Sequence, residues 1–196
     1  MAFALYKTDL GKIDIDYEND VVVSLRSPKE IPQIFKATKE LKSIAFATYE
    51  TVLGTFRIDY EDDVAISLTK LKEAPSEFGI KTKFTDIVFA QLDEYFNGIR
   101  NRFEFKYELR GTQFQKKVWQ VLCTIPYGET RTYKEIAKAI GNKNASQAVG
   151  LANSKNPLMI IVPCHRVIGS KGDLVGYAGG LSLKETLLKI EEISNI

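Results

Sequence analysis

In its C-terminal half the chain reads Ile160-Ile161-Val162-Pro163-Cys164-His165-Arg166-Val167-Ile168. The apolar residues before Pro163 predict a buried strand over residues 158–162, which ends where Cys164 is presented. Cys164 is one of two cysteines and His165 is the only histidine of the chain. A thiol reacts as its thiolate, and a nearby imidazole can take the thiol proton. This pattern indicates a nucleophilic cysteine with a histidine base.

A purely structural role for the same two residues is the main alternative. A cysteine that follows an apolar strand is usually a small buried hydrophobe, and a single histidine is more often structural than catalytic. The pair alone leaves both interpretations open, so the decision depends on the rest of the chain.

The composition is typical of a folded protein. The chain has 196 residues, of which 44% are hydrophobic and 27% charged, enough for one domain or two small ones. No apolar run approaches the ~20 residues of a membrane span, and residues 1–9 lack the pattern of a secretory signal. We therefore expect no membrane contact and a reducing, cytoplasmic or nuclear setting. One histidine and two cysteines argue against a zinc site, and we expect no metal or cofactor.

Charge is unevenly distributed along the chain. Residues 108–196 hold 12 basic and 7 acidic side chains, whereas residues 1–107 hold 15 and 18. A basic C-terminal half suggests a polyanionic partner such as nucleic acid. A basic face that is merely solvated would give the same count.

The N-terminal part contains an internal repeat. Residues 3–35 and 46–78 are identical at 18 of 33 aligned positions. Alternating apolar and polar residues predict three strands in each copy, near 2–7, 12–17 and 21–25, and near 45–50, 55–60 and 64–68. We expect a β-rich N-terminal domain over residues 1–107. The repeat holds no obvious nucleophile, which favours an extended sheet over a second active site.

The C-terminal part, residues 108–196, is expected to be a mainly helical domain, so the chain belongs to the α+β class. Residue spacing and capping signals predict helices over 85–97, 112–122, 133–140, 145–153 and 182–193, and a short strand over 103–107. The helices over 133–140 and 145–153, joined by a tight turn, look like a helix-turn-helix. Cys123 is expected to be buried and not to pair with Cys164.

With these residues assembled, the C-terminal half resembles the O6-alkylguanine-DNA alkyltransferases, also called methylated-DNA–protein-cysteine methyltransferases. The matching elements run in order through residues 111–191: Gly111-Thr112-Gln113-Phe114-Gln115, Val118-Trp119, Ile125-Pro126-Tyr127-Gly128-Glu129-Thr130, Ala148-Val149-Gly150, Asn156-Pro157, Pro163-Cys164-His165-Arg166-Val167, Gly176-Tyr177-Ala178-Gly179-Gly180, Lys184 and Leu187-Leu188. The second copy and the helix after it resemble the family's RNase H-like N-terminal domain, and the C-terminal half its winged-helix-like domain. The family pattern does not include the first copy.

The resemblance implies DNA repair by direct transfer. An alkyl group moves from O6 of guanine, or O4 of thymine, in double-stranded DNA to Cys164. A thiolate suits attack on such a carbon, and the thioether formed is not hydrolysed, so each molecule acts once. The base has to leave the helical stack to reach a buried thiol. The resemblance also implies minor-groove binding and a monomer that needs no cofactor.

The resemblance assigns three sets of residues. The catalytic set has Cys164 as alkyl acceptor, His165 as base through a water molecule, Glu191 as its orienting partner and Asn156 as support of the Cys164 turn. The substrate-binding set is Tyr133, Asn153, Val167, Tyr177, Ala178 and Gly179. The DNA-binding set is Ala145, Ser146, Gln147, Gly150 and Arg166. Arg166 and Lys184 are alternatively structural, and Glu192 is a rival for the place of Glu191.

One position departs from the family. The residue before Ala148-Val149-Gly150 is usually arginine, which fills the gap left by the flipped base, and here it is Gln147. Glutamine is shorter and uncharged, so we expect weaker repair of duplex DNA. Two other functions stay open. One is a non-catalytic protein that binds alkylated DNA, although Cys164 argues against it. The other is a cysteine hydrolase, which would need an oxyanion hole.

Overall fold

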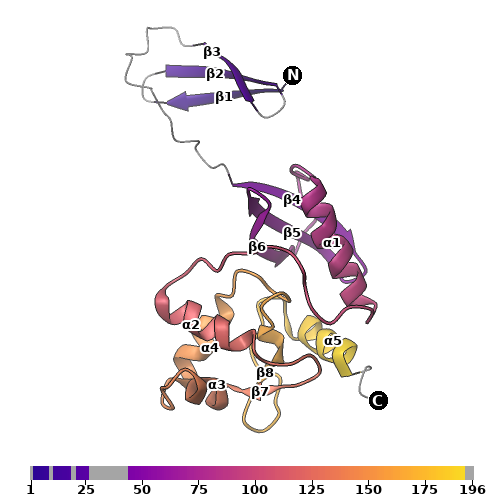
Figure 1. Cartoon of the computed structure of the whole chain (residues 1–196), viewed down its shortest axis with the longest axis vertical. Coiled ribbons are helices and arrows are strands. Elements are labelled where there is room, and N and C mark those ends of the chain that lie inside the picture. The colour runs from indigo at the N-terminus through magenta and orange to yellow at the C-terminus, as the bar shows by residue number, and fades with distance from the viewer. Residues whose placement is uncertain (1, 9–10, 19–20, 27–43, 193–196) are drawn as a thin grey trace. The chain divides into compact units, whose positions relative to one another are not determined.

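The computed structural model describes residues 2–8, 11–18, 21–26 and 44–192. The chain divides into two compact units, Met1–Leu41 and Lys42–Ile196. The described part combines antiparallel sheets with helices (Figure 1), so the predicted α+β class is confirmed. The boundary between the units lies after Leu41, whereas the sequence suggested a division near residue 108. A domain division at residue 108 stays a prediction.

The two copies of the repeat form sheets of the same design. Their strands are β1 (Ala2–Thr8), β2 (Gly11–Glu18) and β3 (Val21–Arg26) in the first unit, and β4 (Ala45–Thr51), β5 (Gly54–Glu61) and β6 (Val64–Lys70) in the second. Each sheet is antiparallel, in the order β1-β2-β3 or β4-β5-β6. The six strands predicted from the alternating pattern are therefore confirmed.

The repeat extends to the hydrogen-bond register. Ala2 lies opposite Tyr17 in the first sheet, as Ala45 lies opposite Tyr60 in the second. Both sheets have an irregularity at the equivalent place, after Asp16 and after Asp59. Similar sequences have thus produced the same pairing, bulge included.

Helix α1 (Lys83–Phe96) packs against the second sheet (Figure 1). Its N-terminus is capped by Thr82, whose hydroxyl accepts the Thr85 N–H while the Thr85 hydroxyl bonds the Thr82 backbone. Its apolar face and the inner face of the sheet are fully buried at Val88, Leu92, Tyr95, Phe56, Ile58 and Leu68. This packing places the C-terminal turn of α1, with Tyr95, in the core of the second unit.

The rest of the second unit is mainly helical. Its elements are α2 (Gln113–Leu122), β7 (Arg131–Thr132), α3 (Tyr133–Ala139), α4 (Ser146–Ser154), the single 3-10 turn η1 (Cys164–Arg166), β8 (Val167–Ile168) and α5 (Leu181–Glu192). Strands β7 and β8 pair in parallel. The buried Trp119 of α2 donates its indole N–H to the carbonyl of Ala152 in α4, at 2.9 Å. All five predicted helices are present.

The predicted strand over residues 158–162 is wrong. The chain turns at Ile160, which has a φ of 73°, and the N–H groups of Ile161 and Val162 bond the carbonyls of Met159 and Leu158. Only isolated bridges remain, Leu68 with Leu158 and Met159 with Val162. The apolar run reflects burial, since these residues are at most 7% exposed. A short apolar run does not by itself distinguish a strand from another buried segment.

The predicted strand over residues 103–107 is wrong too. Only Tyr107 forms a bridge, with Ala65 of β6. The alternating pattern arises instead because the rings of Phe103 and Phe105 are partly buried and pack against the core. A single contact with the sheet edge does not make a ladder.

Backbone hydrogen bonds join the second sheet to the segment that leads to Cys164. The N–H of Leu68 donates to the carbonyl of Pro157 at 2.8 Å, and the N–H of Met159 donates to the carbonyl of Leu68 at 3.2 Å. Strand β6 therefore fixes the start of the turn that presents the thiol.

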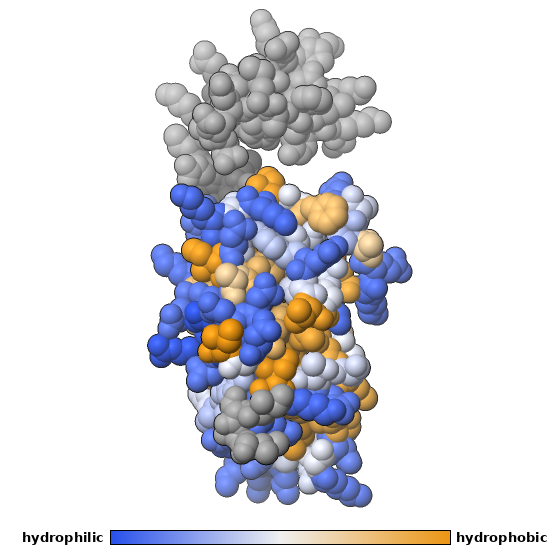
Figure 2. Space-filling view, turned by 90° about the vertical axis from the view of Figure 1, so that its right-hand side faces the viewer, coloured by the Kyte–Doolittle hydropathy of each residue, from blue (hydrophilic) through white to orange (hydrophobic). Residues whose placement is uncertain are grey.

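Figure 2 shows one face of the molecule, on which hydrophobic residues form patches between hydrophilic ones. No helix within the described residues has the length and apolar character needed to cross a membrane.

Candidate active site

Asn156 holds the turn that carries Cys164. Its side-chain amide donates to the carbonyl of Val162 at 2.8 Å and to the Cys164 Sγ at 3.0 Å, while its Oδ1 accepts the Leu158 N–H at 3.0 Å. One buried side chain thus ties the two ends of the turn together and touches the sulfur.

Cys164 is almost completely buried, at 2% exposure. Burial raises the pKa of its thiol to about 11, and the Asn156 hydrogen bond and the Lys184 charge lower it only in part. The thiol is therefore protonated at neutral pH. It needs a base before it can attack.

His165 and Glu191 form a buried pair. His165 Nε2 lies 2.7 Å from Glu191 Oε1, and the two residues are 0% and 1% exposed. Burial lowers the pKa of His165, so its imidazole is neutral at pH 7. The Nδ1 atom is buried and has no hydrogen-bond partner in the structure. With the Nε2 proton directed at the carboxylate, Nδ1 keeps its lone pair and can accept a proton.

Arg166 binds the same carboxylate from the other side. Its Nε lies 2.9 Å from Glu191 Oε2 and its Nη2 3.0 Å from Oε1, while Nη1 donates to the carbonyl of Ile125 at 2.6 Å. Burial alone would raise the pKa of Glu191, but His165 and Arg166 outweigh it and lower the pKa to about 2. Glu191 is thus ionised, its negative charge is balanced by Arg166, and it holds the imidazole of His165 in place.

Arg166 was expected to contact DNA or, alternatively, to be structural. Its buried guanidinium contacts Glu191 and the carbonyl of Ile125, which agrees with the structural alternative. A role in DNA binding stays a prediction. Glu191, and not its rival Glu192, is the residue that faces His165.

Tyr95 is part of this cluster, although no sequence motif points to it. Its hydroxyl donates to Glu191 Oε1 and lies 3.2 Å from His165 Nε2. Helical spacing predicted the helix that carries Tyr95 but not a contact across 70 residues of chain. A tyrosine among other aromatic core residues has no distinguishing local signal.

The predicted substrate-binding residues surround the Cys164 turn. The Tyr133 hydroxyl donates to the carbonyl of Val175 at 3.2 Å, and Lys184 Nζ donates to the carbonyls of Val167 at 2.5 Å and Val175 at 3.0 Å. The Tyr177 ring meets His165 edge-on, with centroids 6.4 Å apart. Lys184 and the loop around Val175 thereby connect Tyr133, Val167 and Tyr177.

Besides His165 Nδ1, two buried polar atoms of this region have no hydrogen-bond partner in the structure, Asn153 Oδ1 and the Tyr177 hydroxyl. Asn153 Nδ2 donates to the carbonyl of Cys164 at 3.2 Å. Gly179 lies against Tyr177, because a Cβ at Gly179 would be 3.1 Å from that ring and 2.6 Å from Leu183. Ala178 is exposed.

The predicted DNA-binding residues of α4 lie at its N-terminus and along its outer side. Gln147 is exposed, Ser146 is partly exposed, and Ala145 is the N-cap residue. Gly150 faces Tyr133, since a Cβ there would be 3.7 Å from the tyrosine ring. Helix α4 therefore presents Gln147 to solvent on one side and adjoins the substrate-binding residues on another.

Cys123 is exposed, contrary to the prediction that it is buried. It is the C-cap residue of α2, where the helix ends at the surface. Its Sγ lies 3.9 Å from the Tyr107 hydroxyl. Cys164 is therefore the buried thiol, and Cys123 is a natural reference for thiol reactivity.

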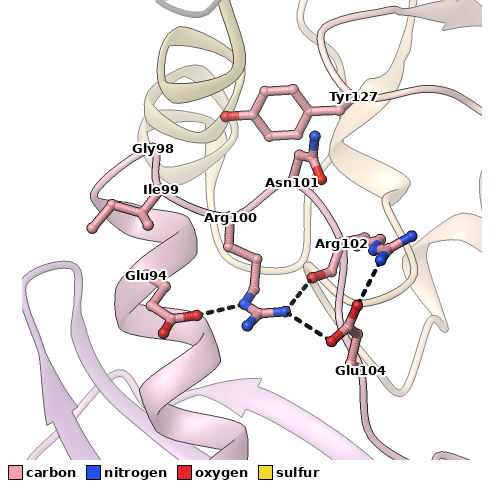
Figure 3. A pocket seen from close by; sticks show the side chains of 8 residues that line it. All are labelled: Glu94, Gly98, Ile99, Arg100, Asn101, Arg102, Glu104 and Tyr127. Carbon is pink, nitrogen blue, oxygen red and sulfur yellow. Dashed lines mark hydrogen bonds and ion pairs between the residues drawn. The ribbon is translucent and has the colours of Figure 1, made fainter.

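A separate pocket of about 470 Å³ lies beside this cluster. It is lined by ion pairs between Arg100 and Glu94 and between Arg102 and Glu104, with Tyr127 on the opposite wall (Figure 3). Its charges are matched within the pocket, and neither Cys164 nor His165 lines it. Among the residues described, no group of three or more His, Cys, Asp or Glu could hold a metal ion.

Known proteins match this chain in sequence. The family described as 6-O-methylguanine DNA methyltransferase, DNA binding domain, matches residues 113–193. A methylated-DNA–protein-cysteine methyltransferase of Methanosarcina barkeri is 63% identical over 102 residues, which are 52% of this chain and 65% of the relative. A protein of the same name from Mycobacterium leprae is 60% identical over 102 residues, 52% of this chain and 62% of the relative. The chain thus spans slightly less than two thirds of these relatives' length.

Solved structures match over more of the chain. The O6-methylguanine methyltransferase of Mycobacterium tuberculosis superposes with a TM-score of 0.71 at 41% identity, over 77% of this chain and 94% of that protein. A complex of the Mycobacterium tuberculosis protein OGT with DNA gives a TM-score of 0.70 at 43% identity, over 76% and 92%. Sequence identity and shared architecture over nearly the whole of these proteins show that this chain belongs to the O6-methylguanine (methylated-DNA–protein-cysteine) methyltransferase family.

Proposed function

We propose that this protein repairs DNA by moving an alkyl group from O6 of guanine, or O4 of thymine, to its own Cys164. The observation that carries the proposal is the buried arrangement around the sulfur. Asn156 holds the thiol, and next to it is a neutral histidine whose Nε2 is fixed by Glu191 and whose Nδ1 is free. This order of nucleophile, base and orienting carboxylate is the one that activated nucleophiles use.

The transfer step follows from these contacts. The Cys164 proton passes through a water molecule to His165 Nδ1, and the sulfur electron pair attacks the alkyl carbon. The S–C bond forms as the C–O6 bond breaks, and guanine leaves as an anion. The Tyr133 hydroxyl protonates this anion, and the proton that His165 took from Cys164 returns through water to the Tyr133 oxygen. The product is a thioether, which water does not cleave. The protein is therefore consumed after one reaction, and the step needs no metal or cofactor.

The lesion is proposed to bind among the substrate-binding residues. The main-chain carbonyls of Cys164 and Val167 would accept from the guanine amino group. Tyr177 and the chain at Ala178 and Gly179 would lie at the O6 side. The unpartnered Asn153 Oδ1 and Tyr177 hydroxyl support this assignment, because buried polar atoms ordinarily have hydrogen-bond partners.

Double-stranded DNA is the proposed partner. The basic half of the chain carries α3 and α4, and α4 offers Ala145, Ser146 and Gln147 beside the substrate-binding residues. We propose that this pair acts as the helix-turn-helix of a winged-helix-like region and enters the minor groove, which reads sequence weakly. The second sheet with α1 would be the RNase H-like part, and the protein would act as a monomer in a reducing compartment.

Intact mass tests the proposed function. The protein is incubated with an oligonucleotide duplex that carries O6-methylguanine and is then digested for peptide mapping. We expect one added methyl group on the peptide with Cys164, none in Cys164→Ser, and normal transfer in Cys123→Ser, which is the matched thiol control. Tight binding without a mass change would contradict the proposal and indicate a protein that only binds lesions.

A further inference from the structure

We infer that Tyr95 is a positioning residue that, together with Glu191, fixes the tautomer of His165, so that α1 takes part in the reaction from outside the DNA-binding half. The inference rests on the proposed transfer to Cys164 and adds a residue that the motifs around Cys164 do not contain. Its basis is that Tyr95, His165 and Arg166 all contact the same carboxylate oxygen, Oε1 of Glu191.

Tyr95 is held in a single place. It lies in the last turns of α1 and is 0% exposed. Rings of three neighbours surround it with centroids 5.4 to 6.0 Å away, those of Phe96, Phe103 and Tyr127. A tyrosine packed this way loses little additional freedom when its hydroxyl is used for a specific contact.

The hydroxyl can make two bonds here, and their directions are set by its neighbours. A phenol has one proton to give and lone pairs to accept with. The Tyr95 proton is directed at Glu191 Oε1, which leaves the oxygen to accept from His165 Nε2 at 3.2 Å. Nε2 therefore faces two acceptors, Glu191 Oε1 at 2.7 Å and Tyr95, and must carry the proton. The free Nδ1 then has to be the base.

Other charged and titratable groups around His165 do not set this tautomer by themselves. Arg166 binds Glu191 from η1 and Lys184 lies on α5, and both positive charges lower the pKa of His165. Tyr177 presents the edge of its ring. In the described structure, His165 Nε2 has hydrogen bonds to Glu191 and to Tyr95.

Without the Tyr95 hydroxyl, Glu191 Oε1 would lose a donor. The carboxylate would then interact more strongly with His165. The pKa of Glu191 and the pKa of the His165 imidazole would both rise. A higher His165 pKa leaves less neutral imidazole near pH 7. The second acceptor at Nε2 would be lost as well, so the hydrogen bond to Glu191 alone would hold the imidazole.

The experiment compares the wild-type protein with Tyr95→Phe and Tyr49→Phe. Tyr49 is the matched control because its hydroxyl contacts α1 through Thr85 and Asp86 and does not touch His165. The chain has one histidine, so imidazole ¹⁵N signals report His165 directly and without DNA. Transfer rates to Cys164 are measured in single turnover from pH 5 to 9, and melting temperatures show whether each variant folds.

We expect the wild-type imidazole to be protonated at Nε2. In Tyr95→Phe the His165 pKa and the acid limb of the rate should move upward, with a transfer rate about tenfold lower at pH 7. Tyr49→Phe should change neither. An imidazole protonated at Nδ1 in the wild type, or identical titrations and rates in Tyr95→Phe, would overturn the inference. If the wild type gains no methyl group at all, the proposed function fails instead. The imidazole readout needs no transfer and stays valid in that case.

Discussion

At the scale of single residues, the pKa of the Cys164 thiol explains why a base is needed. With a thiol pKa of about 11, the thiolate at pH 7 is on the order of one molecule in 10⁴. His165, whose pKa is lowered, stays neutral there and can accept the proton. The wild-type rate should fall only on the acid side, where His165 becomes protonated.

Replacing His165 by glutamine tests this division of roles. We expect the transfer rate of His165→Gln at pH 7 to fall by about 10² to 10⁴. The remaining rate should rise about tenfold per pH unit toward the thiol pKa, because solvent must then remove the proton. Single-turnover rates from pH 6 to 10 check the slope. A flat profile in the variant would contradict proton transfer to His165.

At the scale of elements, α4 determines how the protein is expected to treat duplex DNA. Gln147 is exposed on this helix where the family usually has arginine. A glutamine can bond a base edge but offers neither charge nor a planar guanidinium for stacking in the gap left by a flipped base.

We expect Gln147→Arg to accelerate transfer from O6-methylguanine in duplex DNA by about threefold to thirtyfold, as for one additional charge-assisted contact. Free O6-benzylguanine needs no base flipping, so its rate should change little. Both rates are measured on the same protein preparation. Equal effects on the two substrates would point to a change at Cys164 and against a role in base flipping.

At the scale of the whole molecule, the first copy of the repeat and the cluster around Cys164 belong to different compact units. All residues of the cluster around Cys164, Tyr95 included, belong to the compact unit Lys42–Ile196. The first copy belongs to the other compact unit, Met1–Leu41, and repeats the pairing register of the second sheet.

We therefore expect a chain that begins at Lys42 to fold and to transfer the alkyl group at a rate within about twofold of the full chain. Thermal unfolding and single-turnover kinetics of the two proteins, compared side by side, check this expectation. A large loss of rate with an unchanged melting temperature would show that the first copy contributes to lesion or DNA binding.

The sequence by itself determined the elements whose cause is local. Alternation predicted the six strands, and helical spacing predicted the five helices. The Pro163-Cys164-His165-Arg166 run, in its company of motifs, identified the family. These features depend on neighbouring residues, so a single sequence contains them.

Only the tertiary structure decided how distant residues meet. The apolar run before Cys164 is a tight turn because Asn156 and the edge of β6 hold it, and no local pattern records those contacts. Arg166 binds Glu191, and Tyr95 reaches His165, because folding brings α1, η1 and α5 together around one carboxylate. Burial then sets the protonation of Cys164 and His165, since removing water is what shifts their pKa values.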